Sequence, residues 1–160
     1  MINFVLAETP EQIEQARRLF QEYQMWLNLD LSFQGFESEL ATLPGRYAPP
    51  EGCLLLAIEN ENILGCVALR KIDSEICEMK RLFVRETARG NGIGRELVKE
   101  LIEQARRIGY RKMRLDTLSG RMNTAQNIYS AFGFREIPAY YETPFAQTIF
   151  MEMPLSNQTA

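Results

Sequence analysis

The residues best suited to do chemistry lie in one short segment, residues 89–95, which reads RGNGIGR. Its three glycines alternate at the point where a helix is expected to begin, and glycine lets a backbone approach a ligand closely. The first turn of a helix presents N–H groups without intrahelical partners, at the positive end of the helix dipole. Two flanking arginines can pair with phosphate oxygens. The segment therefore predicts a binding site for a pyrophosphate group.

Two common nucleotide-binding motifs do not account for this segment. A P-loop requires Gly-Lys followed by Ser or Thr, and the chain has no such triplet. A dinucleotide fingerprint, G-x-G-x-x-G, would place Arg95 at its third glycine and leave only Asp116 as the acidic ribose ligand. The strands expected before the segment are joined by short hairpin turns, which is not how a dinucleotide-binding domain begins.

The absence of histidine restricts how a catalytic site in this chain could work. It excludes a Ser-His-Asp or Cys-His catalytic unit and any His-ligated metal site. The three cysteines, Cys53, Cys66 and Cys77, lack C-x-x-C spacing, and each lies in an apolar run, which predicts core residues. Proton transfer would therefore depend on Glu, Asp, Tyr, Lys, Cys or water, and no metal is expected.

Composition and charge predict one globular domain over residues 1–160, with 46% hydrophobic and 24% charged residues. The net charge is −3, yet residues 80–114 contain 11 Lys or Arg against 4 Glu. A basic middle in an acidic chain favours a local anionic ligand over a nucleic-acid track. The chain begins with no signal-peptide pattern and has no apolar run of about 18–20 residues. We therefore expect a cytoplasmic protein with reduced cysteines and with neither a membrane nor a nucleic-acid partner.

Hydrophobic periodicity predicts the element order β-α-α-β-β-β-α-β-α-β-β, a mixed α/β sheet with helices on both faces. Short turns between the second, third and fourth strands favour antiparallel pairing. The helix between the fourth and fifth strands requires those two strands to be parallel. The expected strands are 2–7, 53–59, 63–72, 76–84, 113–118, 134–137 and 148–153, and the expected helices are 9–28, 33–42, 92–108 and 122–131.

Two of these segments resemble motifs of the GNAT superfamily of N-acetyltransferases. Residues 89–94 match that family's acetyl-CoA loop, [RQ]-x-x-G-x-[GA], and IYSAFGFREI at 128–137 is similar to its second motif, a helical tyrosine followed by Gly-Phe. The resemblance covers essentially the whole chain and is weakest over residues 25–52. It implies a GNAT-like fold, with a mostly antiparallel central sheet, a splayed parallel pair at 76–84 and 113–118, and acetyl-CoA as cosubstrate.

The resemblance also implies where acetyl-CoA would bind. Backbone groups of Leu82 to Val84 would bond the pantetheine arm like an added strand, and an N–H near Leu82 would face the thioester carbonyl as an oxyanion stabiliser. Many members have an Asn where this chain has Met122, so Asn123 either replaces that contact or caps a helix. The expected acetyl-CoA-binding residues are Leu82, Phe83, Val84, Arg89, Gly90, Asn91, Gly92, Ile93, Gly94, Arg95, Asn123 and Tyr129.

Two residues match catalytic positions of the family. Tyr129 matches the general acid that protonates the leaving thiolate, and a phenol of pKa about 10 can protonate a thiolate of pKa about 8.5. Its ring could also fill the core beside Phe132, and the two roles are compatible. Glu78 lies where some members carry a Glu that deprotonates the amine through water. Its alternative role is a sheet-surface carboxylate paired with Arg70 or Lys80.

The acceptor side is predicted less sharply, with Phe33, Tyr140 and Tyr141 as candidate contacts. The acidic N-terminal part could attract a cationic amine, and Arg46 or Arg121 could instead hold a carboxylate. The resemblance implies acetyl transfer to the primary amine of a small molecule by direct attack in a ternary complex. The alternatives are a peptide or protein N-acetyltransferase and a non-catalytic acetyl-CoA sensor. The oligomeric state stays open, with a homodimer as one alternative.

Overall fold

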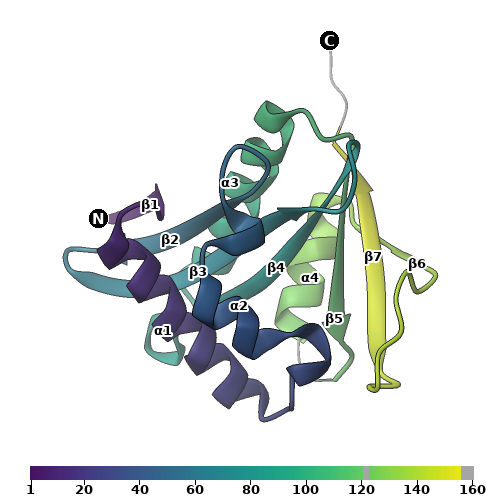
Figure 1. The fold of residues 1–160 in the computed structure, drawn as a ribbon, viewed down its shortest axis with the longest axis horizontal. Helices are drawn as coiled ribbons and strands as arrows, with labels where there is room; N and C mark the ends of the chain where they lie inside the picture. Colours follow the sequence, from purple (N-terminus) through teal and green to yellow (C-terminus); the bar gives the residue numbers. More distant parts are fainter. Residues whose placement is uncertain (121–122, 156–160) are drawn as a thin grey trace.

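The computed structural model describes residues 1–120 and 123–155, apart from the side chain of Phe33. This part of the chain forms a seven-stranded sheet with helices on both faces (Figure 1). The strands are β1 (Ile2–Leu6), β2 (Cys53–Glu59), β3 (Asn62–Lys71), β4 (Ile76–Val84), β5 (Lys112–Leu118), β6 (Arg135–Ile137) and β7 (Thr148–Pro154). The α-helices are α1 (Pro10–Leu27), α2 (Phe36–Thr42), α3 (Ile93–Ile108) and α4 (Asn123–Phe132), and the 3₁₀ turns are η1 (Ser32–Gln34), η2 (Gly45–Tyr47) and η3 (Glu86–Ala88).

The sheet confirms the predicted element order and the mixed α/β class. Its strand order is β1-β2-β3-β4-β5-β7-β6. The strands β2, β3 and β4 are antiparallel, and β4 is parallel to β5, as the turn lengths and the intervening helix predict. Local patterns do not predict that β7 inserts between β5 and β6, because strand order there depends on long-range packing.

The helices divide the core into two layers. In Figure 1, α1 and α2 cover the near face of the sheet, and α3 and α4 lie behind it. Alternation along β4 places Cys77 and Met79 in the core under α3, and Phe83 in the core under α1. The three cysteines are buried and unpaired, as their apolar neighbours predict.

The longest helix, α1, begins where the sequence predicts. The Thr9 hydroxyl accepts a hydrogen bond from the Gln12 N–H, and the Gln12 side chain accepts one from the Thr9 N–H, which together form a capping box. Pro10 occupies the first helical position, where its missing N–H costs no hydrogen bond. Within the described residues, no helix is long and apolar enough to cross a bilayer.

The feature that shapes the site is the separation of β4 from β5. The two strands pair only from Ile76–Lys112 to Glu78–Arg114. Just beyond that point β4 bulges: it uses three residue steps, from Lys80 to Phe83, against two on β3. At the bulge Arg81 has a φ of 62°, which a residue with a side chain adopts only at a cost in free energy.

Contacts of the Arg81 side chain hold this strained residue in place. Its guanidinium donates two hydrogen bonds to Glu39, of 2.9 and 2.8 Å, and lies 4.9 Å from the centre of the Phe36 ring. Glu39 also accepts a hydrogen bond of 3.0 Å from the Tyr47 hydroxyl. The bulge in β4 is therefore tied to α2 and η2, and β4 leaves the edge of β5 at a defined position.

Candidate active site

A cleft with a volume of about 780 Å³ opens where β4 and β5 separate. Its size is typical of a small-molecule or cofactor site. It brings together most of the predicted acetyl-CoA-binding residues, which come from β4, the glycine-rich loop and α4; Asn91 and Tyr129 are not among the lining residues. The cleft is lined by Trp26, Leu82, Phe83, Val84, Arg89, Gly90, Gly92, Ile93, Gly94, Arg95, Gly120, Asn123, Thr124, Ala125 and Ile128.

One end of the cleft is formed by the glycine-rich loop and the start of α3. Gly90 and Gly92 have φ values of 87° and 74°, in the left-handed region that glycine occupies without strain. No side chain caps α3, and the Glu96 N–H is the first to bond back into the helix, reaching the Gly92 carbonyl at 3.1 Å. The N–H groups of residues 93–95 precede that bond, so they are suited to hold an anion.

The two arginines of the loop make contacts within the chain that the sequence did not predict. Arg89 donates a hydrogen bond of 2.9 Å to the Val84 carbonyl, and its guanidinium lies 5.0 Å from the centre of the Trp26 ring. Arg95 lies at the same distance, 5.0 Å, over the Phe132 ring. Both arginines therefore make cation–π contacts, and of the two rings Trp26 lines the cleft. Local sequence could not predict these contacts, because both rings come from other helices.

Two predicted asparagines mainly support the local backbone. Asn91 donates a hydrogen bond of 3.1 Å from its side chain to the Ala88 carbonyl, across one turn of the loop. Asn123 lines the cleft, and its Oδ1 accepts a hydrogen bond of 3.3 Å from the Gly120 N–H. Asn123 thus stabilises the turn before α4 and also borders the cleft. Its neighbour Met122 lies outside the described residues.

Tyr129 is buried in α4, with 4% of its surface exposed. Its ring packs edge-on against Phe134, with ring centres 5.7 Å apart, so the core-packing role is present. Burial raises the pKa of the Tyr129 hydroxyl, and the charges of Tyr23 and Asp116 raise it further. The hydroxyl therefore keeps its proton near neutrality. Its role as the general acid stays a prediction.

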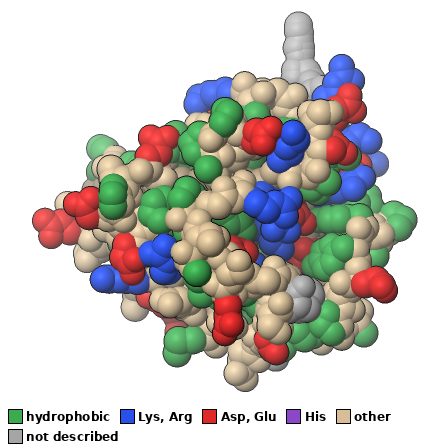
Figure 2. All heavy atoms as spheres, in the orientation of Figure 1, with side chains coloured by type: hydrophobic (Ala, Val, Ile, Leu, Met, Phe, Trp, Pro, Cys, Tyr) green, Lys and Arg blue, Asp and Glu red, His purple; other side chains and the backbone are tan. Residues whose placement is uncertain are grey.

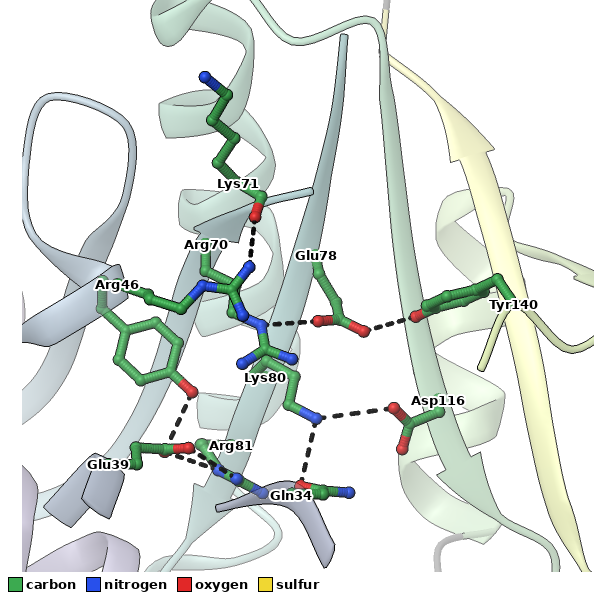
Figure 3. Close-up of polar contacts among 11 residues, drawn as sticks. Gln34, Glu39, Arg46, Arg70, Lys71, Glu78, Lys80, Arg81, Asp116 and Tyr140 are labelled. Atoms are coloured by element: carbon green, nitrogen blue, oxygen red, sulfur yellow. Dashed lines mark hydrogen bonds and ion pairs between the residues drawn. The ribbon is translucent and has the colours of Figure 1, made fainter. Parts of the chain in front are cut away.

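Glu78 is buried, with 2% of its surface exposed, and both of its oxygens have partners (Figure 3). The Arg70 Nε donates a hydrogen bond of 2.8 Å to one oxygen, and the Tyr140 hydroxyl donates one of 2.6 Å to the other. Burial raises the pKa of this carboxyl, but the charges of Lys80 and Arg70 and these hydrogen bonds hold it below its usual value. The alternative pairing with Arg70 is therefore present, and a role as general base stays a prediction.

Lys80 and Asp116 form a second polar pair beside Glu78, on the face of the sheet covered by α1 and α2. The Lys80 Nζ is 3.6 Å from the Asp116 Oδ2 and donates a hydrogen bond of 3.3 Å to Gln34 (Figure 3). Burial lowers the pKa of Lys80. Figure 2 shows Lys and Arg side chains gathered near the middle of this face, with acidic atoms beside them.

The sequence alone did not identify Lys80 or Asp116 as part of the candidate active site. The available signal was the alternation of charged with apolar residues along β4 and β5, where Glu78 and Lys80 alternate with Cys77 and Met79. Such a pattern indicates a polar face of a sheet, but it does not show which charges meet across separated strands.

A smaller cavity, of about 20 Å³, lies on this face between α1, η1 and the loop before β7. The predicted acceptor residue Tyr141 lines it, and Tyr140 in the same loop packs against Phe150. The side chain of Phe33, the third predicted acceptor residue, lies outside the described residues. The cavity is lined by Tyr23, Leu27, Leu31, Gln34, Asp116, Thr117, Leu118, Tyr141, Thr143, Phe145 and Thr148.

No cluster of three or more His, Cys, Asp or Glu in residues 1–120 and 123–155 is arranged to hold a metal ion. The cysteines are also unsuited to nucleophilic attack. Burial raises the pKa of the Cys53 thiol to about 12, and it raises the pKa of Cys66 and Cys77 further, so little thiolate forms near neutrality.

Known acetyltransferases are similar to this chain over most of its length. A model of the acetyltransferase (GNAT) family matches residues 12–134. An uncharacterized N-acetyltransferase of Schizosaccharomyces pombe is 37% identical over 98% of this chain and 96% of its own length. A GNAT-family acetyltransferase from Staphylococcus aureus superposes with a TM-score of 0.80 at 24% identity, over 98% of this chain and all of that protein. The yncA protein of Salmonella typhimurium, solved with its cofactor acetyl-CoA, superposes with a TM-score of 0.73 at 18% identity, over 100% and 97% of the two chains.

Proposed function

The chain belongs to the GNAT family of acetyltransferases, and we propose that it transfers the acetyl group of acetyl-CoA to the primary amine of a small-molecule acceptor. The family predicted from the motifs at 89–94 and 128–137 is thereby confirmed. The observation that carries the proposal is the cleft at the separated strands, with unpaired helix N–H groups at one end and an unpaired strand edge along its side.

The residues present fit acetyl-CoA. The first-turn N–H groups of α3 would hold the pyrophosphate, since they point positive dipoles at the glycine-rich loop. Beyond Glu78, β4 has no parallel partner, so its backbone can bond the pantetheine arm as an added strand would. The Salmonella protein, which has the same fold and was solved with its cofactor acetyl-CoA, supports acetyl-CoA as the cosubstrate. When bound, acetyl-CoA supplies an already activated thioester.

The reaction would proceed by direct attack of the amine on the thioester. The buried cysteines have raised pKa values, which disfavours a covalent acetyl-cysteine. The N–H near Leu82 would stabilise the oxyanion of the tetrahedral intermediate. Tyr129 would protonate the departing thiolate.

The acceptor side supports a small amine more than a peptide. The cavity beside Asp116 has a volume of about 20 Å³ and is bordered by side chains of α1, η1, β5 and the loop before β7, which leaves little room for a peptide chain. A peptide acceptor would need an open groove along this face. The other candidate, a sensor that binds acetyl-CoA without turnover, leaves the buried polar pair at the separated strands without a role.

The test measures thiol release from acetyl-CoA with a panel of small primary amines and a panel of short peptides. Binding is followed separately through Trp26, the single tryptophan of the chain, because it lines the cleft. Amine-dependent thiol release with acetylated amine as product supports the proposal. Turnover on peptides alone favours a peptide acetyltransferase, and a change in Trp26 fluorescence without any turnover favours a sensor.

A further inference from the structure

One carboxylate oxygen beside the separated strands lacks a hydrogen bond. The Asp116 side chain is 16% exposed, and its buried Oδ2 has no hydrogen-bond partner among the described residues. The Tyr141 hydroxyl lies beside the same carboxylate, whose charge and hydrogen bonding raise the pKa of that hydroxyl. The Lys80 Nζ balances the charge of Asp116 from 3.6 Å, which is too far for a hydrogen bond. Buried polar atoms nearly always have a partner. An unpartnered carboxylate oxygen therefore indicates a position that a ligand or a water completes.

Asp116 lies on β5, beside the point where β4 and β5 separate. It is two residues beyond the last β4–β5 pair, Glu78–Arg114, on the strand that faces the opening. Its charge contributes to the raised pKa of both Tyr129 and Tyr23, so the carboxylate is close to the predicted proton donor. The adjoining cavity of about 20 Å³ has room for one water. The nitrogen of an amine has a similar size and could take that position.

We propose that the Asp116 carboxylate accepts a hydrogen bond from the attacking amine and takes up the proton that the amine loses. This inference rests on the proposed function and assigns the acceptor end of the same site. Of the nearby described carboxylates, Asp116 has the free oxygen that this role requires, whereas both oxygens of Glu78 are engaged by Arg70 and Tyr140.

Lys80 determines whether the amine binds in its charged or its uncharged form. Its buried ammonium lies beside the Asp116 Oδ2 and bonds to Gln34. An ammonium ion on the same oxygen would face the Lys80 charge across a site with little water, and like charges repel strongly there. The pair therefore selects an uncharged primary amine, whose nitrogen lone pair is free to attack.

The proposed acetyl transfer conserves atoms and charge. The nitrogen lone pair forms the C–N bond while the carbonyl π electrons move onto oxygen. The N–H proton passes to Asp116, and the C–S bond breaks as the carbonyl re-forms. The thiolate takes a proton from Tyr129, and the proton held by Asp116 returns through water to the tyrosinate. The products are the acetamide and the CoA thiol, and both side chains recover their starting states.

The test compares Asp116→Asn with Asp73→Asn, a matched control that removes the same charge. Asp73 caps a turn after β3 through bonds to the Glu75 and Ile76 N–H groups, which Asn can also accept. The assay is thiol release with the best substrate from a panel of ethanolamine, benzylamine, putrescine and glycinamide. Acetyl-CoA affinity is read from Trp26 fluorescence, and folding from thermal melting. Asp116→Glu is included because it keeps the charge pair with Lys80 if the Asn variant folds poorly.

We expect Asp116→Asn to lower kcat about 100-fold or more, with acetyl-CoA affinity within twofold of the wild type. Asp73→Asn should retain wild-type kcat, and Asp116→Glu should fold and lose at least tenfold, since its oxygen is displaced by one methylene. If Asp116→Asn and Asp116→Glu retain wild-type kcat while Glu78→Gln loses it, Asp116 does not have this role. If the wild-type protein binds acetyl-CoA and acetylates no amine, the proposed function itself fails and this inference fails with it.

Discussion

Replacing Arg81 with methionine tests the Arg81–Glu39 ion pair that holds the bulge in β4, where β4 leaves β5. Arg81 is 4% exposed, adopts a φ of 62°, and donates two hydrogen bonds to Glu39, whose side chain is 11% exposed. Methionine has a similar length but no charge. Arg81→Met therefore leaves the Glu39 carboxylate buried without its counter-ion, while the strained backbone remains.

The expected loss of stability is large. Breaking a buried ion pair by removing one partner costs about 3–5 kcal/mol. With a urea m-value of about 2 kcal/mol/M, the midpoint of unfolding should fall by about 2 M. Adding Glu39→Gln should recover most of this loss, because a neutral amide needs no counter-ion and can still accept the hydrogen bond from the Tyr47 hydroxyl.

Urea unfolding of the single and double variants at several pH values measures both effects. Burial raises the pKa of Glu39, but the Arg81 hydrogen bonds and charge hold it below its usual value. The stabilisation is therefore present above the unfolded pKa of about 4.3 and is lost as the pH falls through the lower folded pKa. The wild type should lose more stability on acidification than Arg81→Met. A loss below about 1 kcal/mol for Arg81→Met at neutral pH, or no recovery on adding Glu39→Gln, would refute this reasoning.

Three further predictions concern the cleft. Gly92→Ala should weaken acetyl-CoA binding, measured by Trp26 fluorescence, and should lower the free energy of unfolding by about 1–2 kcal/mol because of left-handed strain. The control is Gly109→Ala, at another glycine with a positive φ, which should lower stability by a similar amount and leave acetyl-CoA binding unchanged. Tyr129→Phe should lower kcat about 100-fold at unchanged acetyl-CoA affinity, and equal kcat would remove Tyr129 as the acid. Because the amine binds uncharged, kcat/KM should rise with pH up to the pKa of the amine itself, and a less basic amine should shift the profile to lower pH by the difference in pKa. A kcat/KM profile that does not shift with the pKa of the amine would contradict this prediction.

Local patterns predict the parts of the site that depend on local physics. The glycines at 90 and 92 and the start of α3 are adjacent in the chain, so the phosphate end of the cleft could be predicted from residues 89–95 alone. The parallel pairing of β4 and β5 also follows, because a single helix connects them. The start of α1 could also be predicted, because Thr9 and Pro10 are adjacent to the first turn that they cap.

Other parts depend on contacts between distant residues. An arginine in a strand, such as Arg81, does not by itself indicate a positive φ, since the bulge is held by Glu39, which is 42 residues away in sequence. The stacking of Arg89 on Trp26 likewise joins the loop to the end of α1. Asp116 becomes a candidate for the acceptor site only once β4 and β5 are seen to separate beside it.

The most direct test of the central claim is the initial rate of thiol release measured over a grid of acetyl-CoA and amine concentrations. Direct transfer at one cleft predicts thiol release that depends on the amine, with double-reciprocal lines that intersect, because both substrates must be bound before the reaction. Parallel lines, or a burst of thiol without amine, would show an acetylated enzyme and would contradict the account.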